Sequence, residues 1–279
     1  MQGQIIKIVS DLHYVSSNGN IYPCKCRGIF RKEHITPNVG DYVLFSSDKK
    51  VIEEVLPRKN EFERPKVSNI DQAFIITSLV NPDFSLNLLD KLLVLMELHN
   101  VEAIICITKE DLVDDDKLKE IYGILDYYKK IGYKVVSNQD ISTIKGLLKG
   151  KTSVFTGQTG AGKSTLLNKI NPEWNLETGE VSLALGRGRH TTRVVELFEV
   201  CEGKVMDTPG FSALDFNKYS KENIRDAFRE FGNYPCPFKD CMHTKEKECV
   251  VKSKVLDNNI LESRYMNYLN FIEEDKKWK

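Results

Sequence analysis

Short runs of alternating apolar and polar residues fill the first part of the chain, residues 1–63. Such alternation is typical of half-buried strands. It predicts strands at residues 5–9, 14–17, 21–28, 42–47 and 49–56. The sequence Asn18-Gly19-Asn20 lies between the second and third runs and is typical of a turn. About five strands in some sixty residues favour a small β-barrel such as an OB-fold.

The periodicity changes over residues 64–215. Continuous apolar runs predict buried strands at residues 73–79, 103–108, 134–137, 153–157 and 204–206. Helical spacing predicts helices between them at residues 85–100, 114–131 and 163–170. Alternating strands and helices predict an α/β fold with a parallel sheet covered on both faces. Such sheets bind ligands at the carboxyl ends of their strands. Residues 216–279 predict a helix, a cysteine-rich loop and another helix.

Composition narrows the class of protein. The chain has 279 residues, of which 41% are hydrophobic, so it can form packed cores and is not a disordered protein. Lys+Arg and Asp+Glu are 40 each, so the net charge is zero and gives the chain no overall attraction to nucleic acid. Any contact with RNA therefore needs a local basic patch. Neither a signal peptide nor an apolar run of membrane-spanning length is present. We therefore expect a soluble, cytoplasmic protein with no membrane partner.

One basic stretch lies within the predicted barrel. Lys25, Arg27, Arg31 and Lys32 flank Phe30. Basic residues with an aromatic among them are typical of surfaces that bind single-stranded nucleic acid. The same pattern also fits a solvated strand face with one phenylalanine in the core. Both interpretations remain open at this point.

A phosphate-binding loop follows the strand at 153–157. Residues 157–164 match G-x-x-x-x-G-K-[ST] between a predicted strand and a predicted helix, as this motif requires. Its glycines let backbone N–H groups surround phosphates at a helix N-terminus. We expect Lys163 to reach the β- and γ-phosphates and Ser164 to bind Mg²⁺. The predicted nucleotide-binding residues here are Gly157, Gln158, Thr159, Gly160, Ala161, Gly162, Lys163, Ser164 and Thr165.

The base is predicted to be guanine. The strand at 103–108 ends in Thr108-Lys109-Glu110-Asp111, a T-K-x-D sequence. A carboxylate at Asp111 can accept hydrogen bonds from both N1–H and the 2-amino group of guanine, an arrangement that adenine lacks. The stem of Lys109 can lie over the flat base. Ser137 would complete the pocket through backbone contacts. The alternative role for Asp111 is that of a helix cap.

Two further segments are expected to meet the γ-phosphate. Asp207-Thr208-Pro209-Gly210 follows a short strand and matches D-x-x-G. Asp207 would hold Mg²⁺ through water, and the Gly210 N–H would contact the γ-phosphate. The segment around Gly186 to Thr192 has neither helical nor strand periodicity and predicts a mobile loop. We expect Thr192, or else its neighbour Thr191, to supply the second hydroxyl to Mg²⁺.

The order of these motifs is unusual for a GTPase, because T-K-x-D precedes the P-loop. A circular permutation preserves such a site, since only the places of the strands matter. In this order, TKED, GQTGAGKST, GRGRHTT, DTPGF and CPFKDCMH closely resemble the RsgA family, also called YjeQ, over essentially the whole chain. The family usually has Asn where this chain has Thr108. We expect little consequence, because the Thr hydroxyl can still brace the loop.

The resemblance implies three domains. These are an OB-fold RNA-binding domain at residues 1–63, a circularly permuted P-loop GTPase domain at 64–215 and a helical zinc-binding domain at 216–279. It also implies a role in late maturation of the small ribosomal subunit, with that subunit and its rRNA as partners. The bound particle would stimulate hydrolysis of GTP to GDP. We expect the protein to be monomeric.

Three cysteines and a histidine crowd into the C-terminal segment. The spacing is Cys236-x₄-Cys241-x-His243-x₅-Cys249. Three thiolates and one imidazole form a closed set of four ligands that suits tetrahedral, structural zinc. The spacing lacks the common C-x-x-C pair, and the family resemblance strengthens the assignment.

A further group must orient the attacking water. Many GTPases place a glutamine directly after D-x-x-G, but here that residue is Phe211, which cannot bind water. His190 lies beside Thr191 and Thr192, and an imidazole there can orient or deprotonate water. The predicted catalytic residues are therefore His190, Lys163 and Thr192. The alternative interpretation is that His190 contacts rRNA or only shapes its loop.

Two other functional classes compete with a GTPase. A P-loop ATPase or kinase is disfavoured by TKED and by the lack of an obvious acceptor site. A nucleic-acid-binding module whose GTP site is a switch with negligible turnover remains open because of Phe211.

Overall fold

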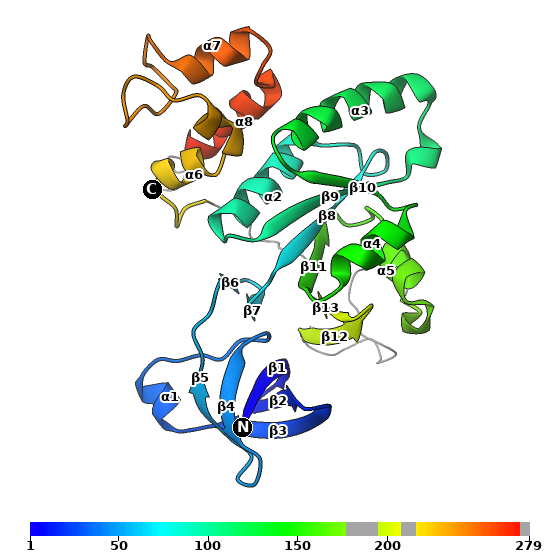
Figure 1. Cartoon of the computed structure of the whole chain (residues 1–279), viewed down its shortest axis with the longest axis vertical. Coiled ribbons are helices and arrows are strands. Elements are labelled where there is room, and N and C mark those ends of the chain that lie inside the picture. The colour runs from blue at the N-terminus through cyan, green and yellow to red at the C-terminus, as the bar shows by residue number, and fades with distance from the viewer. Residues whose placement is uncertain (177–194, 208–215, 274–279) are drawn as a thin grey trace.

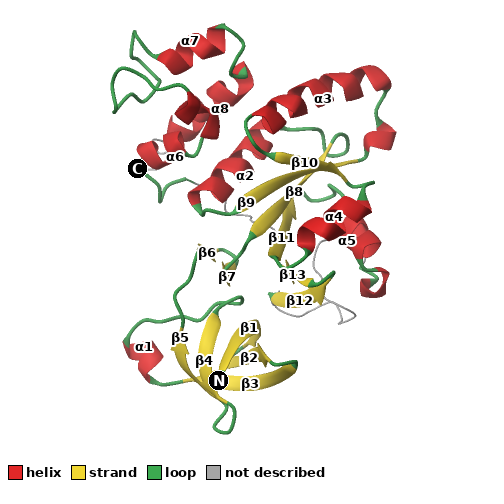
Figure 2. Ribbon diagram, in the orientation of Figure 1, coloured by secondary structure: helices red, strands yellow, loops and turns green. Residues whose placement is uncertain are grey.

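The protein has three parts arranged along its long axis (Figure 1). The structure, a computed structural model, describes residues 1–176, 195–207 and 216–273. A small barrel forms one end, a sheet with helices on both faces forms the middle, and a helical C-terminal segment forms the other end (Figure 2). The predicted division at residues 63 and 64 falls in the turn of a hairpin between the first two parts.

The N-terminal barrel agrees with the sequence pattern. Its strands are β1 (Gln2–Val9), β2 (Leu12–Ser17), β3 (Asn20–Cys26), β4 (Tyr42–Ser46) and β5 (Val51–Val55). They pair in the order β1-β2-β3-β5-β4, and β4 pairs back onto β1 to close the barrel. Alternate residues such as Val15, Val43 and Phe45 fill its core with no exposed surface. The short helix α1 (Ile29–Lys32) was not predicted.

The middle part is the expected α/β unit. Parallel strands lie in the order β10-β9-β8-β11-β13, and the antiparallel strand β12 follows β13. These strands are β8 (Gln72–Ser78), β9 (Glu102–Thr108), β10 (Lys134–Ser137), β11 (Thr152–Gly157), β12 (Glu196–Val200) and β13 (Gly203–Asp207). The helices are α2 (Leu86–Leu98), α3 (Asp115–Lys130), α4 (Ile141–Leu148) and α5 (Lys163–Ile170), with short 3₁₀ turns at Glu110–Leu112 and Pro172–Trp174.

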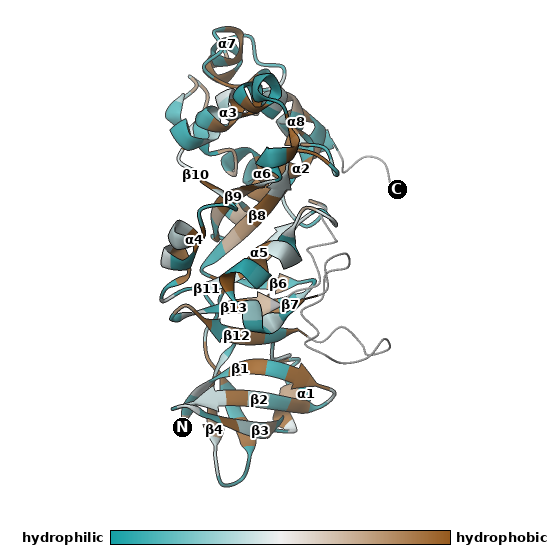
Figure 3. Cartoon of the chain, turned by 90° about the vertical axis from the view of Figure 1, so that its right-hand side faces the viewer, coloured by the Kyte–Doolittle hydropathy of each residue, from teal (hydrophilic) through white to brown (hydrophobic). Residues whose placement is uncertain are grey.

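The apolar runs are continuous because both faces of the sheet are covered. Ile75 and Ile105 face α2 and α3, whereas Phe74, Ile104 and Cys106 face α4 and α5. Every residue of β8 is buried, as parallel central strands require. Figure 3 shows the resulting hydrophobic colouring along β8 and β9.

The barrel continues the central sheet. Strand β1 pairs with β12, so eleven strands of the described residues form one sheet that runs through both parts. A hairpin of β6 (Glu61–Glu63) and β7 (Lys66–Ser68) bridges them. Neither β12 nor this hairpin was predicted, because each is short and bordered by charged residues.

The C-terminal segment packs against α2 through buried charges. Its elements are α6 (Lys221–Asp226), a 3₁₀ helix at Arg229–Asn233, α7 (Val250–Leu256) and α8 (Glu262–Glu273). Arg264 of α8 donates to Asp90 of α2 at 2.7 Å and to Glu230 at 2.6 Å. Asp90 also accepts from Tyr128 and Asn267, each at 2.6 Å. Each of these buried charges therefore has an oppositely charged partner, as buried ions require.

Candidate nucleotide site and metal centre

The P-loop lies between β11 and α5, at the carboxyl end of the sheet. Gly157, Gly160 and Gly162 have positive φ angles of 146°, 78° and 95°. A Cβ atom on Gly157 would stand 2.2 Å from the carbonyl oxygen of Ile76 on the neighbouring strand β8. Only glycine therefore lets this loop pass so close to the sheet. Residues 157–162 form the loop, and Lys163, Ser164 and Thr165 begin α5.

Lys163 folds back over the loop. Its ammonium group donates to the carbonyl oxygens of Gly157 at 2.8 Å and Gln158 at 2.6 Å. The side chain is almost wholly buried, and burial lowers the pKa of Lys163 to about 8. Phosphate oxygens would supply this ammonium group with the negative charge that its surroundings lack.

The T-K-x-D sequence reaches the P-loop directly. Thr108 ends β9 and is fully buried, and its hydroxyl donates to the carbonyl oxygen of Ala161 at 2.7 Å. This contact is the brace that the sequence analysis expected of the Thr hydroxyl. Lys109 follows in the left-handed region with φ 61°, and its ammonium group donates to the carbonyl oxygen of Asn81.

Asp111 is exposed in the 3₁₀ turn beyond Lys109. The cap of α3 is Asp114, whose carboxylate accepts from the Lys117 N–H at 2.8 Å. The alternative role of Asp111 as the cap of this helix is therefore wrong. Asp111 itself is an exposed residue three positions beyond the end of β9.

Ser137 stands beside this turn at the end of β10, opposite Ile107 of β9. Its hydroxyl donates to Glu110, which also accepts from Tyr122. The residue between Lys109 and Asp111 thus ties the base motif to β10 and α3. This role of Glu110 could not be predicted, because an x position in a motif carries no signal.

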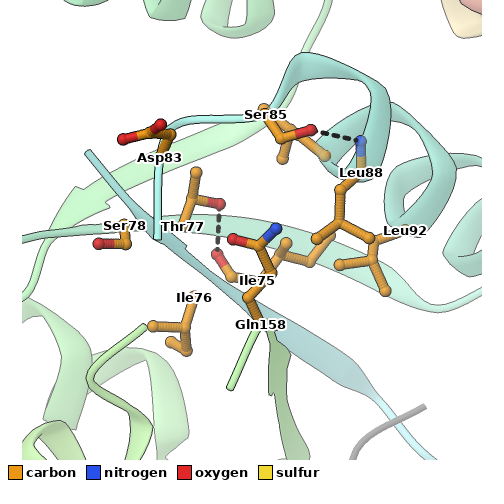
Figure 4. Close-up of a pocket in the computed structure, with 11 residues that line it drawn as sticks. Ile75, Ile76, Thr77, Ser78, Asp83, Ser85, Leu88, Leu92 and Gln158 are labelled. Atoms are coloured by element: carbon orange, nitrogen blue, oxygen red, sulfur yellow. Dashed lines mark hydrogen bonds between the residues drawn. The ribbon is translucent and has the colours of Figure 1, made fainter. Parts of the chain in front are cut away.

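A narrow hollow opens beside the P-loop, between β8 and α2 (Figure 4). Gln158 points into it from the loop, while Thr77 and Ser85 line it from the sheet and the start of α2. The Ser85 hydroxyl caps α2 by accepting from the Leu88 N–H at 3.3 Å. No sequence motif indicated this hollow.

Of the remaining predicted nucleotide-binding and catalytic residues, the structure describes only a part. The backbone of Asp207 ends β13, next to the P-loop strand β11. His190, Thr191, Thr192, Gly210 and Phe211 lie outside the described residues.

The structure brings Cys236, Cys241, His243 and Cys249 together. Their sulfur and imidazole nitrogen atoms all lie within 4.8 Å of one another. Nδ1 of His243 is 3.5 Å from Sγ of Cys236, 3.4 Å from Sγ of Cys241 and 3.3 Å from Sγ of Cys249. All four ligand atoms converge on one point, as a tetrahedral metal centre requires.

The chemistry of this cluster also fits a divalent cation. Burial raises the pKa of Cys241 to about 12, and the neighbouring thiols of Cys236 and Cys249 add to the effect. Thiolates packed so tightly need a cation to remain charged. The Cys₃His cluster is therefore compatible with a zinc site.

The basic stretch of the barrel is divided between surface and core. Phe30 is buried among the barrel residues, whereas Lys25, Arg27, Arg31 and Lys32 are exposed. The phenylalanine is thus a core residue and not a surface for stacking bases. Across the described parts of the chain, none of the helices has the length and apolar character needed to cross a membrane.

Known proteins resemble the chain over its whole length. Residues 55–217 match the family described as RsgA GTPase, and residues 2–51 match the RsgA N-terminal domain. The small ribosomal subunit biogenesis GTPase RsgA of Latilactobacillus sakei is 47% identical, covering 98% of this chain and 96% of the relative. The protein of the same name from Enterococcus faecalis is 45% identical, covering 98% and 95%.

Solved structures share the fold. YloQ, described as a circularly permuted GTPase, superposes with a TM-score of 0.84 at 38% identity, covering 100% of this chain and 96% of that one. YjeQ from Thermotoga maritima superposes with a TM-score of 0.87 at 35% identity, covering 100% and 99%. With the base motif and the P-loop in permuted order on one sheet, the chain is a member of the RsgA GTPase family and a GTP-hydrolysing enzyme.

Proposed function

We propose that this GTPase binds the small ribosomal subunit, assists its late maturation, and hydrolyses GTP to GDP and phosphate faster on the particle. The assembly role is supported by its relatives, which are named small ribosomal subunit biogenesis GTPases. The hydrogen bond from Thr108 to Ala161 carries the nucleotide assignment, because it joins the base motif to the phosphate loop. We propose that the protein acts as a cytoplasmic monomer.

The nucleotide would span the edge formed by β10, β9, β8 and β11. Asp111 would accept from the guanine N1–H and 2-amino groups, with the stem of Lys109 against the base and the backbone at Ser137 closing the pocket. The loop at 157–165 would bind the phosphates, with the Lys163 ammonium group placed at the β- and γ-phosphates. Asp207 and Gly210 would stand at the γ-phosphate end.

Magnesium bound with GTP would neutralise charge that develops on the phosphates during transfer. In this proposal Ser164, at the first turn of α5, would supply one hydroxyl to the ion, and Thr192 would supply the second. Asp207 would hold the ion through water. The backbone of Asp207 ends a strand that is directly paired with β11, which supports this arrangement.

We assign a single structural zinc to Cys236, Cys241, His243 and Cys249. The convergence of all four ligand atoms supports this assignment. A closed set of protein ligands leaves no open coordination site, so the metal stabilises the fold and takes no part in hydrolysis.

The barrel would contribute an rRNA surface. Lys25 lies on β3, Arg27 follows that strand, and Arg31 and Lys32 lie on α1, all exposed. These four cations are close together in the sequence of a chain whose net charge is zero, and Lys25 also forms an exposed ion pair with Asp11 at 3.4 Å. With Phe30 in the core, binding there would come from phosphate contacts and would weaken steeply with salt.

His190 would orient or deprotonate the attacking water. The chemical reason is that Phe211, at the place usual for glutamine, cannot bind water. A histidine used mainly in the transition state lowers kcat when it is removed and leaves nucleotide affinity intact.

The test is the multiple-turnover GTPase rate with increasing amounts of purified small subunits. We expect a rise of at least about tenfold for the wild type, and loss of most of that rise for His190→Ala with unchanged GTP affinity. A His190→Ala variant that is fully stimulated would move water positioning to rRNA or to a protein of the particle. If the wild type shows no stimulation, the ribosomal role is wrong and the nucleotide site alone remains.

A further inference from the structure

Residues of the barrel and of the predicted nucleotide site are cross-strand neighbours in the continuous sheet. Lys7 of β1 is the partner of Glu196 on β12, and Glu196 is in turn the partner of Asp207 on β13. The Lys7 ammonium nitrogen lies 2.5 Å from Oε2 of Glu196. A residue of the barrel therefore stands two strands away from the acidic residue of D-x-x-G, in the same row.

Apolar packing fixes β1 against the GTPase part. The pairing of β1 with β2 shifts register between Ile5 and Lys7, which makes Ile6 the extra residue of a bulge. Ile5 lies in the barrel core, whereas Ile6 packs against the GTPase core that contains Leu197 of β12 and Met206 of β13. One strand thus belongs to two cores, and the barrel cannot turn without disturbing β12 and β13.

A second polar contact reaches β13. The Lys204 ammonium group donates to Oε1 of Gln4 at 2.6 Å, and the Gln4 amide donates to the carbonyl oxygen of Gly40 at 3.1 Å. A Cβ atom on Gly40 would stand 2.1 Å from the carbonyl oxygen of Ser68 and 3.1 Å from the terminal methyl group of Met206. The barrel loop at Gly40 is therefore pressed directly against the sheet.

A buried ion pair holds that loop. Arg58 donates to both carboxylate oxygens of Asp41, each at 2.8 Å, and Asp41 is fully buried. The Ser68 hydroxyl donates to the same carboxylate at 2.5 Å. Rigid elements joined in this way transmit a displacement from one part of the molecule to the other.

The charge of Lys7 gives it a specific role in the contact between the barrel and the β12–β13 hairpin. The backbone of Glu196 is directly opposite that of Asp207 in the antiparallel pair of β12 and β13, so Glu196 stands on the strand next to the end of β13. Lys7 supplies a cation to Glu196 from the barrel side. Loss of that cation would leave the half-buried Glu196 carboxylate without its partner on the strand that pairs with the end of β13.

We propose that Lys7 is a positioning residue for hydrolysis, which aligns the Asp207 end of β13 by its ion pair with Glu196. Through this contact, binding of the small subunit to the barrel is coupled to the nucleotide site. This inference rests on the role proposed above for Asp207. Lys7 touches neither the nucleotide nor the reacting atoms. It acts through Glu196 and the register of three strands.

The test compares kcat and KM for subunit-stimulated GTP hydrolysis in full-length variants. We expect Lys7→Met to lower the stimulated kcat roughly tenfold with KM within about twofold of the wild type, because alignment acts on the transition state. Lys7→Arg keeps the cation and should restore the rate. Glu196→Gln should cause a loss similar to that of Lys7→Met, and the double variant should lose no more than either single variant.

The control is Lys149→Met, which removes an ion pair with Glu202 at the other end of the β12–β13 hairpin and should leave kcat unchanged. A wild-type kcat for Lys7→Met, or additive losses in the double variant, would overturn the inference. If subunits do not stimulate the wild type, the same comparison on the unstimulated kcat decides.

Asp207→Asn, measured in parallel, distinguishes failure of the role proposed for Asp207 from failure of the role proposed for Lys7. If Asp207→Asn hydrolyses GTP with the normal magnesium dependence, the role of Asp207 is wrong and the inference falls with it. If Asp207→Asn is impaired while Lys7→Met is normal, only the inference is wrong.

Discussion

The hydroxyl of Thr108 donates a hydrogen bond to the carbonyl oxygen of Ala161 at 2.7 Å. The two residues are 53 apart in the chain, yet they join the end of β9 to the turn before α5. Their contact explains why permutation of the motifs leaves the site intact. The sheet brings the two strand ends together, whichever comes first in the sequence.

Removing this hydroxyl should weaken nucleotide binding. We expect Thr108→Val to lose about 1–3 kcal/mol of GDP binding free energy, because the buried Ala161 carbonyl loses its donor. Thr108→Ser retains a hydroxyl and serves as the matched control. Calorimetric titration with GDP measures both affinities. Equal affinities for Thr108→Val and the wild type would show that the contact does not support the loop.

Nucleotide binding should take up a proton near pH 8. Burial lowers the pKa of Lys163 to about 8 in the free protein, so near that pH about half of the molecules carry a neutral lysine. Phosphates favour the ammonium form and raise the pKa again. We therefore expect uptake of about half a proton at pH 8 and almost none at pH 6.5, with affinity falling as pH rises above 8.

Calorimetry of GDP binding in buffers of different ionisation enthalpy measures this uptake. Lys163→Arg stays charged throughout the range and should abolish it, even if its affinity is lower. Uptake that is the same in Lys163→Arg would assign the proton to another group.

The cysteine cluster should hold zinc. We expect one tightly bound zinc per chain, and we expect Cys236→Ser and Cys249→Ser to unfold the C-terminal segment while GTP binding survives. The reason is that a short polar loop gains most of its folding free energy from the metal. Cys201→Ser, outside the cluster, is the control. Protein purified without chelator that contains no zinc would contradict this assignment.

The buried arginine should be essential for the attachment of the C-terminal segment to α2. Arg264→Met leaves the carboxylates of Asp90 and Glu230 buried without their cation, which costs about 3–5 kcal/mol. Lys254→Ala removes the exposed ion pair with Asp257 and should change the free energy of unfolding by less than about 1 kcal/mol. Denaturant unfolding compares the two. Similar small losses in both variants would show that the buried cluster is not a stabilising joint.

The main strands and helices and the positions of the motifs can be predicted from the sequence where hydrophobic periodicity and motif coincide. The barrel, the parallel strands and the P-loop turn follow from local patterns, and the Cys₃His residues meet as their spacing suggests. The pairing of Lys7 with Glu196 could not be predicted, because it depends on where a separate barrel docks. Arg264 carries no sign in the sequence that it is fully buried, since its partners come from distant helices.

The most direct test of the account is the base preference of Asp111→Asn. We expect the variant to lose GTP affinity about 10- to 100-fold and to gain affinity for xanthosine triphosphate, because an amide offers one donor and one acceptor where the carboxylate offered two acceptors. Competition between the two nucleotides, measured on wild type and variant, gives both affinities. A variant that binds GTP as tightly as the wild type would contradict the assignment of T-K-x-D as the guanine-reading motif of this permuted site.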